Sequence, residues 1–83
     1  MQKSEVLQVI YKHFRENVDI DEDVEINPSL AMSDQGAGSL DIVEIISAAT
    51  RELQIKIPRT ELINLKNIDE LADLFYTKLN ESS

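Results

Sequence analysis

Apolar residues recur at intervals of three and four positions in three separate stretches of the chain. This spacing places the apolar side chains on one face of a helix, so each stretch must bury that face against another element. The 83 residues are enough for one small domain and too few for two. We therefore predict a single all-α domain over residues 1–83, a small four-helix bundle of three longer helices and one short helix.

The first predicted helix runs from Ser4, a candidate N-cap, to about Asn17. Its apolar face carries Val6, Leu7, Ile10 and Phe14. The next segment, Val18–Gly38, contains both glycines and no sustained period, so it is predicted to be a long loop between the first and second helices. Three apolar side chains are expected to pin this loop to the core: Ile26, Leu30 and Met32.

The second helix is expected over Leu40–Leu53, with an apolar face of Ile42, Ile45, Ile46, Ala49 and Leu53. Leu40 and Val43 lie off the centre of that face, so we expect them to be partly exposed. An extended connector follows at Ile55, Ile57 and Pro58, because a residue before proline avoids helical geometry. A short helix is predicted near Glu61–Asn64.

The last helix is predicted from a candidate capping box, Asn67 with Glu70 three residues later. Its apolar face continues through Ile68, Leu71, Ala72, Phe75 and Leu79. We expect it to end at about Lys78 or Leu79, with a short polar tail from about residue 80.

The charge of the chain limits its partners. Acidic residues are twice as numerous as basic ones, and the net charge is −8. Such a chain repels nucleic acid phosphates and anionic lipid, so we expect neither as a partner and expect basic patches on any protein that binds it. The alternative is that the acidity only keeps a small protein soluble.

Several features of the sequence indicate a soluble, cytoplasmic protein. It has no cysteine, no signal-peptide pattern near Met1, and no apolar run close to the roughly 18–20 residues that cross a bilayer. We expect it to be a monomer.

Neither a metal site nor intrinsic catalysis is predicted. Asp19, Asp21 and Asp23 match the first ligand positions of a calcium loop, but Val24 stands where that loop needs glycine and Leu30 where it needs glutamate. The single histidine, His13, is expected to be exposed, and no second histidine or cysteine could share a metal or activate a nucleophile with it. We predict no catalytic residue and no metal.

Ser39 follows two nearby glycines and stands directly before the second helix. Serine is a good N-cap, so the first interpretation is that its hydroxyl only caps the helix. The second is that Ser39 is also an attachment point. The glycines leave the hydroxyl uncrowded, and free N–H groups at a helix start suit a phosphate ester.

The residues around Ser39 resemble the acyl carrier protein family in its wider sense, which includes peptidyl carriers. The family pattern Gly-x-Asp-Ser-Leu-Asp is matched by Gly36-Ala37-Gly38-Ser39-Leu40-Asp41 and followed by Val43, Glu44, Ile45 and Ile46. The resemblance extends to Ile57-Pro58 and to the start of the last helix, at Ile68, Asp69 and Leu71. It therefore covers nearly the whole chain.

The resemblance implies that Ser39 accepts 4'-phosphopantetheine from coenzyme A, in a magnesium-dependent reaction run by a separate phosphopantetheinyl transferase. The protein would then carry acyl groups as thioesters on that arm between partner enzymes of fatty-acid, polyketide or other specialised lipid biosynthesis. These partners would load, elongate or transfer the acyl group. The lack of cysteine fits this hypothesis, because the working thiol would belong to the arm.

The resemblance also assigns two surfaces. Basic patches of partner enzymes would dock on Leu40, Asp41, Val43 and Glu44. Part of an acyl chain would be sheltered by Ile45, Ile46, Ala49, Leu53, Ile57 and Leu65. A plainly filled core is the alternative for this second set.

The chain departs from the family pattern at four positions. Gly38 replaces the usual aspartate before the serine, Gln35 replaces an apolar residue, and Thr50 and Arg51 stand where fatty-acid carriers are commonly acidic. These changes favour a carrier dedicated to a specialised pathway. Two alternatives remain open: an aminoacyl or peptidyl carrier of a nonribosomal-type pathway, and an acidic helical interaction module that is never modified.

Overall fold

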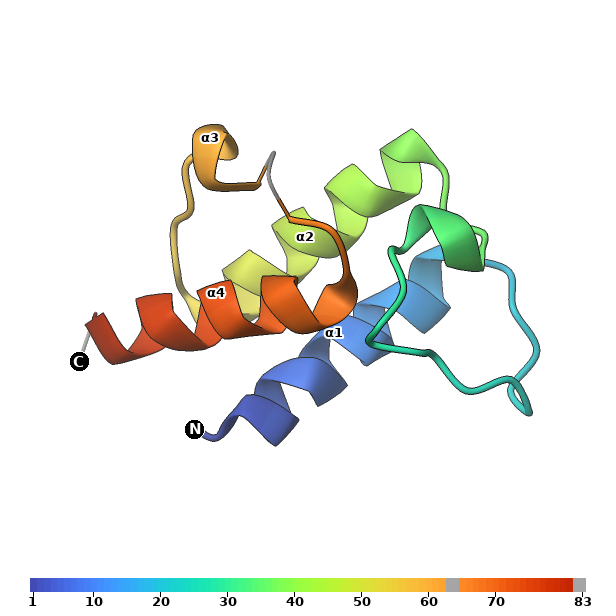
Figure 1. Ribbon diagram of the computed structural model, residues 1–83, viewed down its shortest axis with the longest axis horizontal. Helices are drawn as coiled ribbons and strands as arrows, with labels where there is room; N and C mark the ends of the chain where they lie inside the picture. Colours follow the sequence, from blue (N-terminus) through green and yellow to red (C-terminus); the bar gives the residue numbers. More distant parts are fainter. Residues whose placement is uncertain (63–64, 82–83) are drawn as a thin grey trace.

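The computed structural model describes residues 1–62 and 65–81, and this part of the chain is helical without a strand. Figure 1 shows α1 (Lys3–Asn17), α2 (Ser39–Leu53), α3 (Arg59–Leu62) and α4 (Ile68–Glu81), with one turn of 3-10 helix, η1 (Ser33–Gln35), before α2. The predicted all-α bundle of three longer helices and one short helix is confirmed. None of the described helices is long and apolar enough to cross a membrane.

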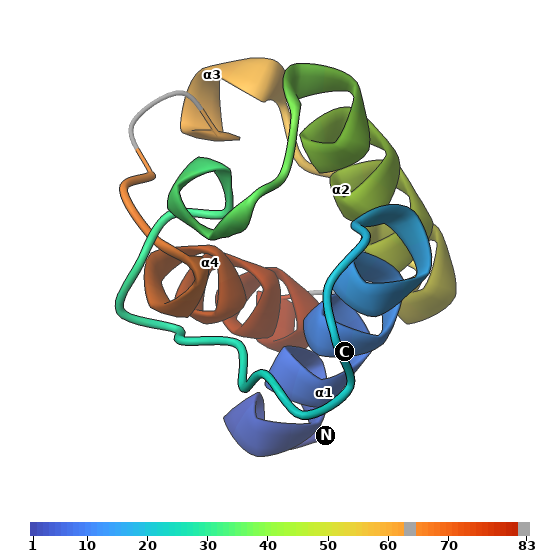
Figure 2. The same cartoon turned by 90° about the vertical axis from the view of Figure 1, so that its right-hand side faces the viewer.

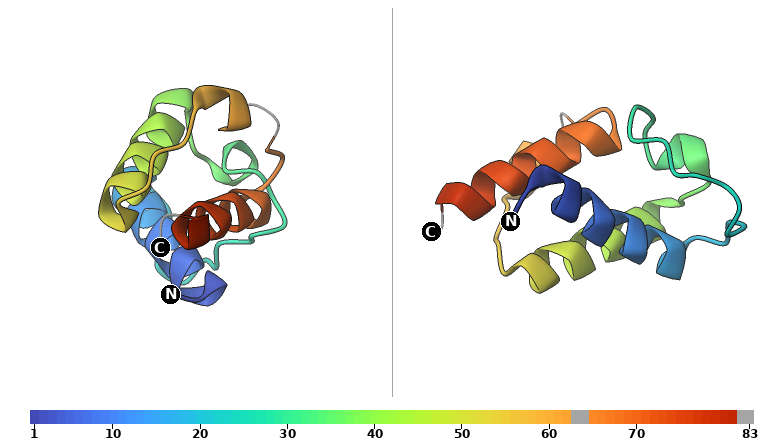
Figure 3. Two further views of the ribbon diagram at one scale, coloured as in Figure 1. Left: turned by 90° about the vertical axis from the view of Figure 1, so that its left-hand side faces the viewer. Right: turned by 90° about the horizontal axis from the view of Figure 1, so that it is seen from below.

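The first helix, α1, is the centre of the bundle. It packs against both α2 and α4, whereas α2 and α4 have few contacts with each other. Seen from below, α1 lies between the other two long helices (Figure 3). The predicted apolar faces supply the buried core, which includes Val6, Ile10, Phe14, Ile45, Ala49, Leu53, Ile68, Leu71, Ala72 and Phe75.

The first helix begins differently from its prediction. Gln2 is its N-cap residue, and its carbonyl accepts the N–H groups of Glu5 and Val6 at 3.0 and 3.2 Å. The Glu5 carboxylate accepts the Gln2 N–H in return, at 3.0 Å. Ser4 therefore lies inside the first turn, and the expectation that it caps the helix is wrong.

The ends of α3 and α4 differ from prediction by a few residues. At the start of α4, Asn67 Oδ1 accepts the Glu70 N–H at 2.8 Å, as the capping box predicts. The Glu70 carboxylate, however, accepts the Lys66 N–H at 2.6 Å instead of the Asn67 N–H. The helix continues to Glu81, past the predicted end. The short helix starts at Arg59 instead of Glu61. Its predicted end, Asn64, lies outside the described residues.

The long loop crosses one end of the bundle. Figure 2 shows it leaving α1, passing the N-terminal end of α4 and returning through η1 to α2. The carbonyls of Pro28 and Leu30 accept the N–H groups of Asp69 and Ile68 at 2.9 and 3.2 Å, so the loop caps α4. Residues buried along it include Val18, Ile26, Met32 and Ala37. The Leu30 side chain is 42% exposed, so its predicted role as an anchor is wrong.

Gln35 holds the last part of this loop. Its side-chain amide accepts the Asn27 N–H at 2.7 Å and donates to the Asn27 carbonyl at 2.9 Å. This paired contact ties η1 to the preceding loop. A polar residue in place of the family's usual apolar one is therefore explained by its backbone partners.

His13 is not the exposed side chain that the sequence suggests. Only 12% of its side chain is accessible, because the end of α2 packs against α1 at this position. Its Nε2 lies 2.8 Å from Glu52 Oε1, and its Nδ1 lies 3.6 Å from Glu16 Oε2. Lys12 Nζ contacts the same Glu52 oxygen at 2.6 Å. Glu52 of α2 therefore forms contacts with two side chains of α1.

The contacts of Glu52 with Lys12 and His13 predict that the stability of the fold depends on pH. The hydrogen bond from Lys12, and after it that from His13, lowers the pKa of Glu52 below its ordinary value of 4.5. A group with a lowered pKa stabilises the fold above its unfolded pKa and loses that contribution as pH falls through its folded value. We expect Glu52→Gln to flatten the fall in unfolding free energy between about pH 5 and pH 3.

Urea titrations of both proteins across that range measure this effect. Glu22→Gln is the matched control, because the Glu22 carboxylate has no ion-pair partner among the described residues. Parallel pH profiles for the parent and Glu52→Gln would contradict the assignment.

Candidate functional site

The first turn of α2 carries the candidate site. Gly38 is the N-cap residue, with φ −81° and ψ 171°, and Ser39 is the first helical residue. The interpretation of the Ser39 hydroxyl as the helix cap is therefore wrong. The Asp41 carboxylate provides the capping contact instead, because its Oδ2 accepts the Gly38 N–H at 3.0 Å.

The segment before the helix turns the chain so that Ser39 faces solvent. Gly36 has φ 101°, a left-handed conformation that favours glycine. Ala37 then anchors the segment, because its side chain is buried and its N–H donates to the Met32 carbonyl at 3.1 Å. With the turn at Gly36 and the anchor at Ala37, Ser39 is exposed to solvent. The site lies at the end of the molecule opposite the start of α1 and the end of α4 (Figures 1 and 3).

The site suits a phosphate ester. The N–H groups of Ser39, Leu40 and Asp41 have no acceptor among the described residues. Unpaired N–H groups at a helix start, together with the positive end of its dipole, stabilise a nearby anion. The Ser39 hydroxyl also makes no hydrogen bond with a described residue. The residues present therefore fit a phosphodiester on Ser39 Oγ.

The four residues predicted to meet partners lie around this turn in different environments. Leu40 is 83% exposed and Val43 57% exposed, which confirms that they lie off the buried face. Glu44 is also exposed, one turn after Leu40. Asp41 is half-buried and bound to the Gly38 N–H. Leu40, Val43 and Glu44 thus form the accessible surface beside Ser39.

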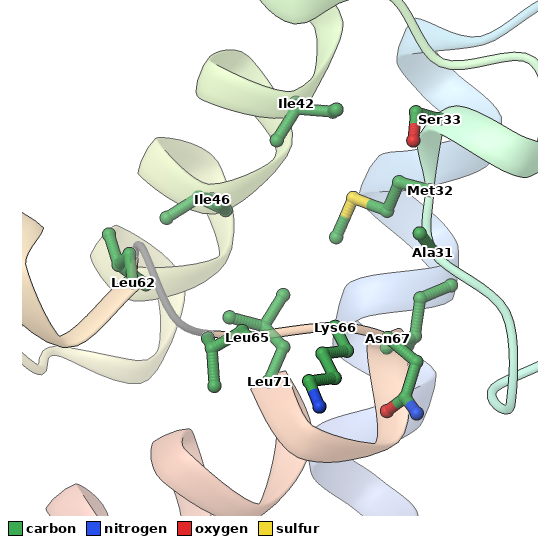
Figure 4. Close-up of a pocket in the computed structure, with 11 residues that line it drawn as sticks. Ala31, Met32, Ser33, Ile42, Ile46, Leu62, Leu65, Lys66, Asn67 and Leu71 are labelled. Carbon is green, nitrogen blue, oxygen red and sulfur yellow. The ribbon is translucent and has the colours of Figure 1, made fainter.

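Two hollows lie along α2. The first, the inner cavity, has a volume of about 180 Å³. Figure 4 shows Ile42 and Ile46 of α2 on one side of it and Met32 of the loop on the other. The second, the outer groove, has a volume of about 700 Å³ and lies between α2 and the residues from Ile55 to Leu62.

The six residues predicted to shelter an acyl chain are divided between these hollows and the core. Ile46 lines both hollows, Leu65 the inner cavity and Ile57 the outer groove. The other three are buried and line neither: Ile45, Ala49 and Leu53. This separation arises because one side of α2 packs closely on α1. Ile42 and Ile46 lie on another side, which faces α4 across a region with few helix contacts.

Sequence reasoning missed several residues of the inner cavity. These are Met32, Ile42, Leu62 and Leu71. Ile42 precedes Ile46 by one helical turn, so the helical interval could have identified it. Met32 comes from a loop whose path has no periodic signal. No group of three His, Cys, Asp or Glu side chains that could hold a metal occurs within residues 1–62 and 65–81.

The geometry of Gly38 predicts the effect of restoring the family's usual aspartate. Its φ of −81° is one that any residue adopts, so the backbone does not require glycine at this position. A Cβ there would lie 3.4 Å from Asp41 Oδ2, which is van der Waals contact without a clash. We expect Gly38→Asp to change the unfolding free energy by only a few tenths of a kcal/mol, since Asp is a good N-cap but would repel Asp41.

The same variant tests recognition by a transferase. If the missing carboxylate is a recognition charge, a general fatty-acid-type transferase should modify Gly38→Asp faster than the parent. Gly38→Asn is the control, because it keeps the capping ability without the charge. Equal modification rates for all three proteins would remove Gly38 as an argument for a carrier dedicated to a specialised pathway.

Comparisons with known proteins agree with this geometry. The model of the phosphopantetheine attachment site family matches residues 8–75. The polyketide biosynthesis acyl-carrier-protein AcpK of Bacillus subtilis is 33% identical over 82 residues, 99% of this chain and 100% of that protein. An acyl carrier protein of Thermosynechococcus vestitus is 28% identical over 79 residues, 95% of this chain and 98% of its own.

A solved structure gives the same result for the fold. It is a crystal structure of the curacin biosynthetic pathway HMG synthase in complex with an acetyl-donor acyl carrier protein. The match has a TM-score of 0.84 and 41% identity, and covers 94% of this chain and 100% of the other. With the family match over most of its length, this chain belongs to the acyl carrier proteins, which hold their acyl cargo on phosphopantetheine and are not themselves enzymes.

Proposed function

We propose that Ser39 is the residue that carries the 4'-phosphopantetheine arm. The observation that supports this most is the exposed Ser39 hydroxyl at the first residue of α2, beside three N–H groups without a described acceptor. The bound arm supplies a terminal thiol, which holds acyl groups as thioesters. The chain itself presents the hydroxyl and stabilises the phosphodiester through the start of α2.

The attachment reaction needs a second protein. Ser39 Oγ must lose its proton as it forms the new bond to phosphorus. No described side chain forms a hydrogen bond with that hydroxyl, and the Asp41 carboxylate beside it is bound to the Gly38 N–H. The base therefore belongs to a phosphopantetheinyl transferase, which closes over the exposed start of α2.

Intact mass after incubation with coenzyme A, magnesium and a broad-specificity transferase tests the proposal. One added arm, located on Ser39 by fragmentation, is the expected result. An unchanged mass would favour the alternative of an interaction module that is never modified. Loading of the arm with an amino acid in preference to an acyl group would favour a peptidyl carrier.

The polyketide class of pathway is the second part of the proposal. The Bacillus relative is a polyketide carrier, and the matched solved structure contains an acetyl donor bound to an HMG synthase. We propose that this chain likewise delivers a short acyl group within a specialised pathway. The acetyl-loaded protein should lose its acetyl group faster to an HMG synthase than to a fatty-acid elongating synthase, and the reverse preference would indicate a housekeeping role.

Partner docking is proposed at Leu40, Val43 and Glu44, the accessible residues beside Ser39. Exposed charges at the edge of an interface mainly set the association rate. We expect Glu44→Lys to slow acyl transfer to the cognate enzyme by about tenfold at low salt, with a smaller loss at high salt because of screening. Stopped-flow measurements at two salt concentrations check this.

Glu22→Lys is the matched control for this charge change, since Glu22 is an exposed carboxylate of the long loop. It should slow transfer much less than Glu44→Lys. Equal slowing by both variants would mean that net charge, and not this surface, governs association.

A further inference from the structure

Only some of the positively charged side chains of this acidic protein have partners within the described part of the fold. Of its eight lysines and arginines, four are engaged: Lys3, Lys12 and Lys78 form ion pairs, and Arg15 donates to the carbonyls of Asp21 and Val24. The side chains of the other four have no hydrogen-bond or ion-pair partner among the described residues: Arg51, Lys56, Arg59 and Lys66. Arg51 is in the last turn of α2, and the other three lie between the end of α2 and the start of α4.

Two of these free cations line the outer groove. Lys56 is on the connector and Arg59 is the first residue of α3, and both are exposed. The left view of Figure 3 shows the connector and α3 beside α2. Half-buried apolar side chains lie between them, including Ile46, Ile57 and Leu62. The groove is therefore apolar inside and positive at its edge.

No described carboxylate forms an ion pair with Lys56 or Arg59. Glu52 binds Lys12 and His13, and Glu61 binds Lys78 Nζ at 3.1 Å. The positive edge thus persists on a molecule whose net charge is −8. A small anion would satisfy the charges but leave the apolar side chains in water. A ligand that removes both from water must itself be acidic and apolar.

We propose that the outer groove is a second docking surface, which binds an amphipathic segment of a partner protein with aliphatic side chains flanked by aspartate or glutamate. The two surfaces share Val43, but the cations at the edge of the groove favour a charge opposite to the one that Glu44 favours. A protein segment fits better than a membrane, because the remaining acidic surface repels anionic lipid. This proposal does not depend on modification of Ser39.

The test uses the unmodified, isotope-labelled protein and two synthetic peptides. Both peptides have leucines at helical intervals, and the flanking positions are glutamate in one and lysine in the other. In NMR titrations the glutamate peptide should shift amide resonances of residues that line the groove, such as Ile46, Thr50 and Ile57. The lysine peptide should leave those resonances unchanged.

Two charge-reversed proteins locate the binding site. Lys56→Glu with Arg59→Glu should weaken binding of the glutamate peptide by about tenfold, because two attractions become repulsions. Arg51→Glu with Lys66→Glu is the matched control. It makes the same change in net charge with two unpaired cations that do not line the groove. Its affinity should fall by less than about threefold. Unchanged thermal midpoints show that both variants fold.

Three results would overturn the proposal. The first is equal weakening by the two variants, which would indicate a net-charge effect. The second is an absence of shifts at the groove with the glutamate peptide. The third is a stronger shift of the same resonances with anionic lysophospholipid micelles than with the peptide, which would identify a lipid surface instead.

Discussion

Replacing Ser39 with alanine is expected to abolish attachment of the arm completely while leaving the fold intact. The acceptor oxygen is lost, and the chain offers no cysteine as a substitute nucleophile. Stability should change by less than about 0.5 kcal/mol, because Ser39 is the first helical residue and alanine has high helix propensity. A capping serine would instead cost about 0.5–2 kcal/mol when removed. Intact mass and urea unfolding measure the two effects.

Two other serines provide matched controls for this variant. Ser33 is the first residue of η1 and Ser47 lies two turns into α2, so neither lies at the start of α2. Ser33→Ala and Ser47→Ala should each gain one arm at the parent rate. Continued modification of Ser39→Ala would show that the arm is attached elsewhere, and the proposed function of Ser39 would be lost.

The second large effect is expected from Phe14→Ala in α1. Phe14 is 0% exposed and belongs to the core that α1 shares with its neighbouring helices. Truncating a buried phenylalanine costs about 3–5 kcal/mol, from lost apolar burial and from the cavity that remains. A domain of this length has a total stability of about 4–12 kcal/mol, so the variant should lose at least a quarter of its unfolding free energy and unfold at a much lower urea concentration. Far-UV circular dichroism in urea measures the loss.

Leu40→Ala is the control for this experiment. It also removes a large apolar side chain, but Leu40 is 83% exposed. Its free energy of unfolding should stay within about 0.5 kcal/mol of the parent's, whereas its transfer of acyl groups to a partner should slow. If Phe14→Ala and Leu40→Ala had equal midpoints, the division between core and docking surface would be wrong.

The carrier thus presents two surfaces of unlike charge along α2, which meet at Val43. Leu40, Val43 and Glu44 surround the proposed attachment point, while Lys56 and Arg59 edge the outer groove. A partner that used both would be oriented as well as attracted, because each surface repels the charge that the other accepts. The paired charge-reversal experiments separate their contributions.

The sequence by itself determined the class of fold and the position of the candidate site. Helical intervals are local, so the bodies of α1, α2 and α4 were predicted to within a few residues. The match of Gly36–Asp41 to a family pattern identified Ser39 without any coordinates. The exposure of Leu40 and Val43 also followed from the helical period, because they lie off the apolar face.

Only the tertiary structure decided how individual side chains are used. The contact between His13 and Glu52 joins residues far apart in sequence, and depends on how α2 packs on α1. The same packing sends Ile45 into the core and Ile46 toward both hollows, although the two are adjacent and equally apolar. Sequence periodicity defines a helical face, but the neighbouring helices decide which part of that face is covered, and this depends on non-local packing.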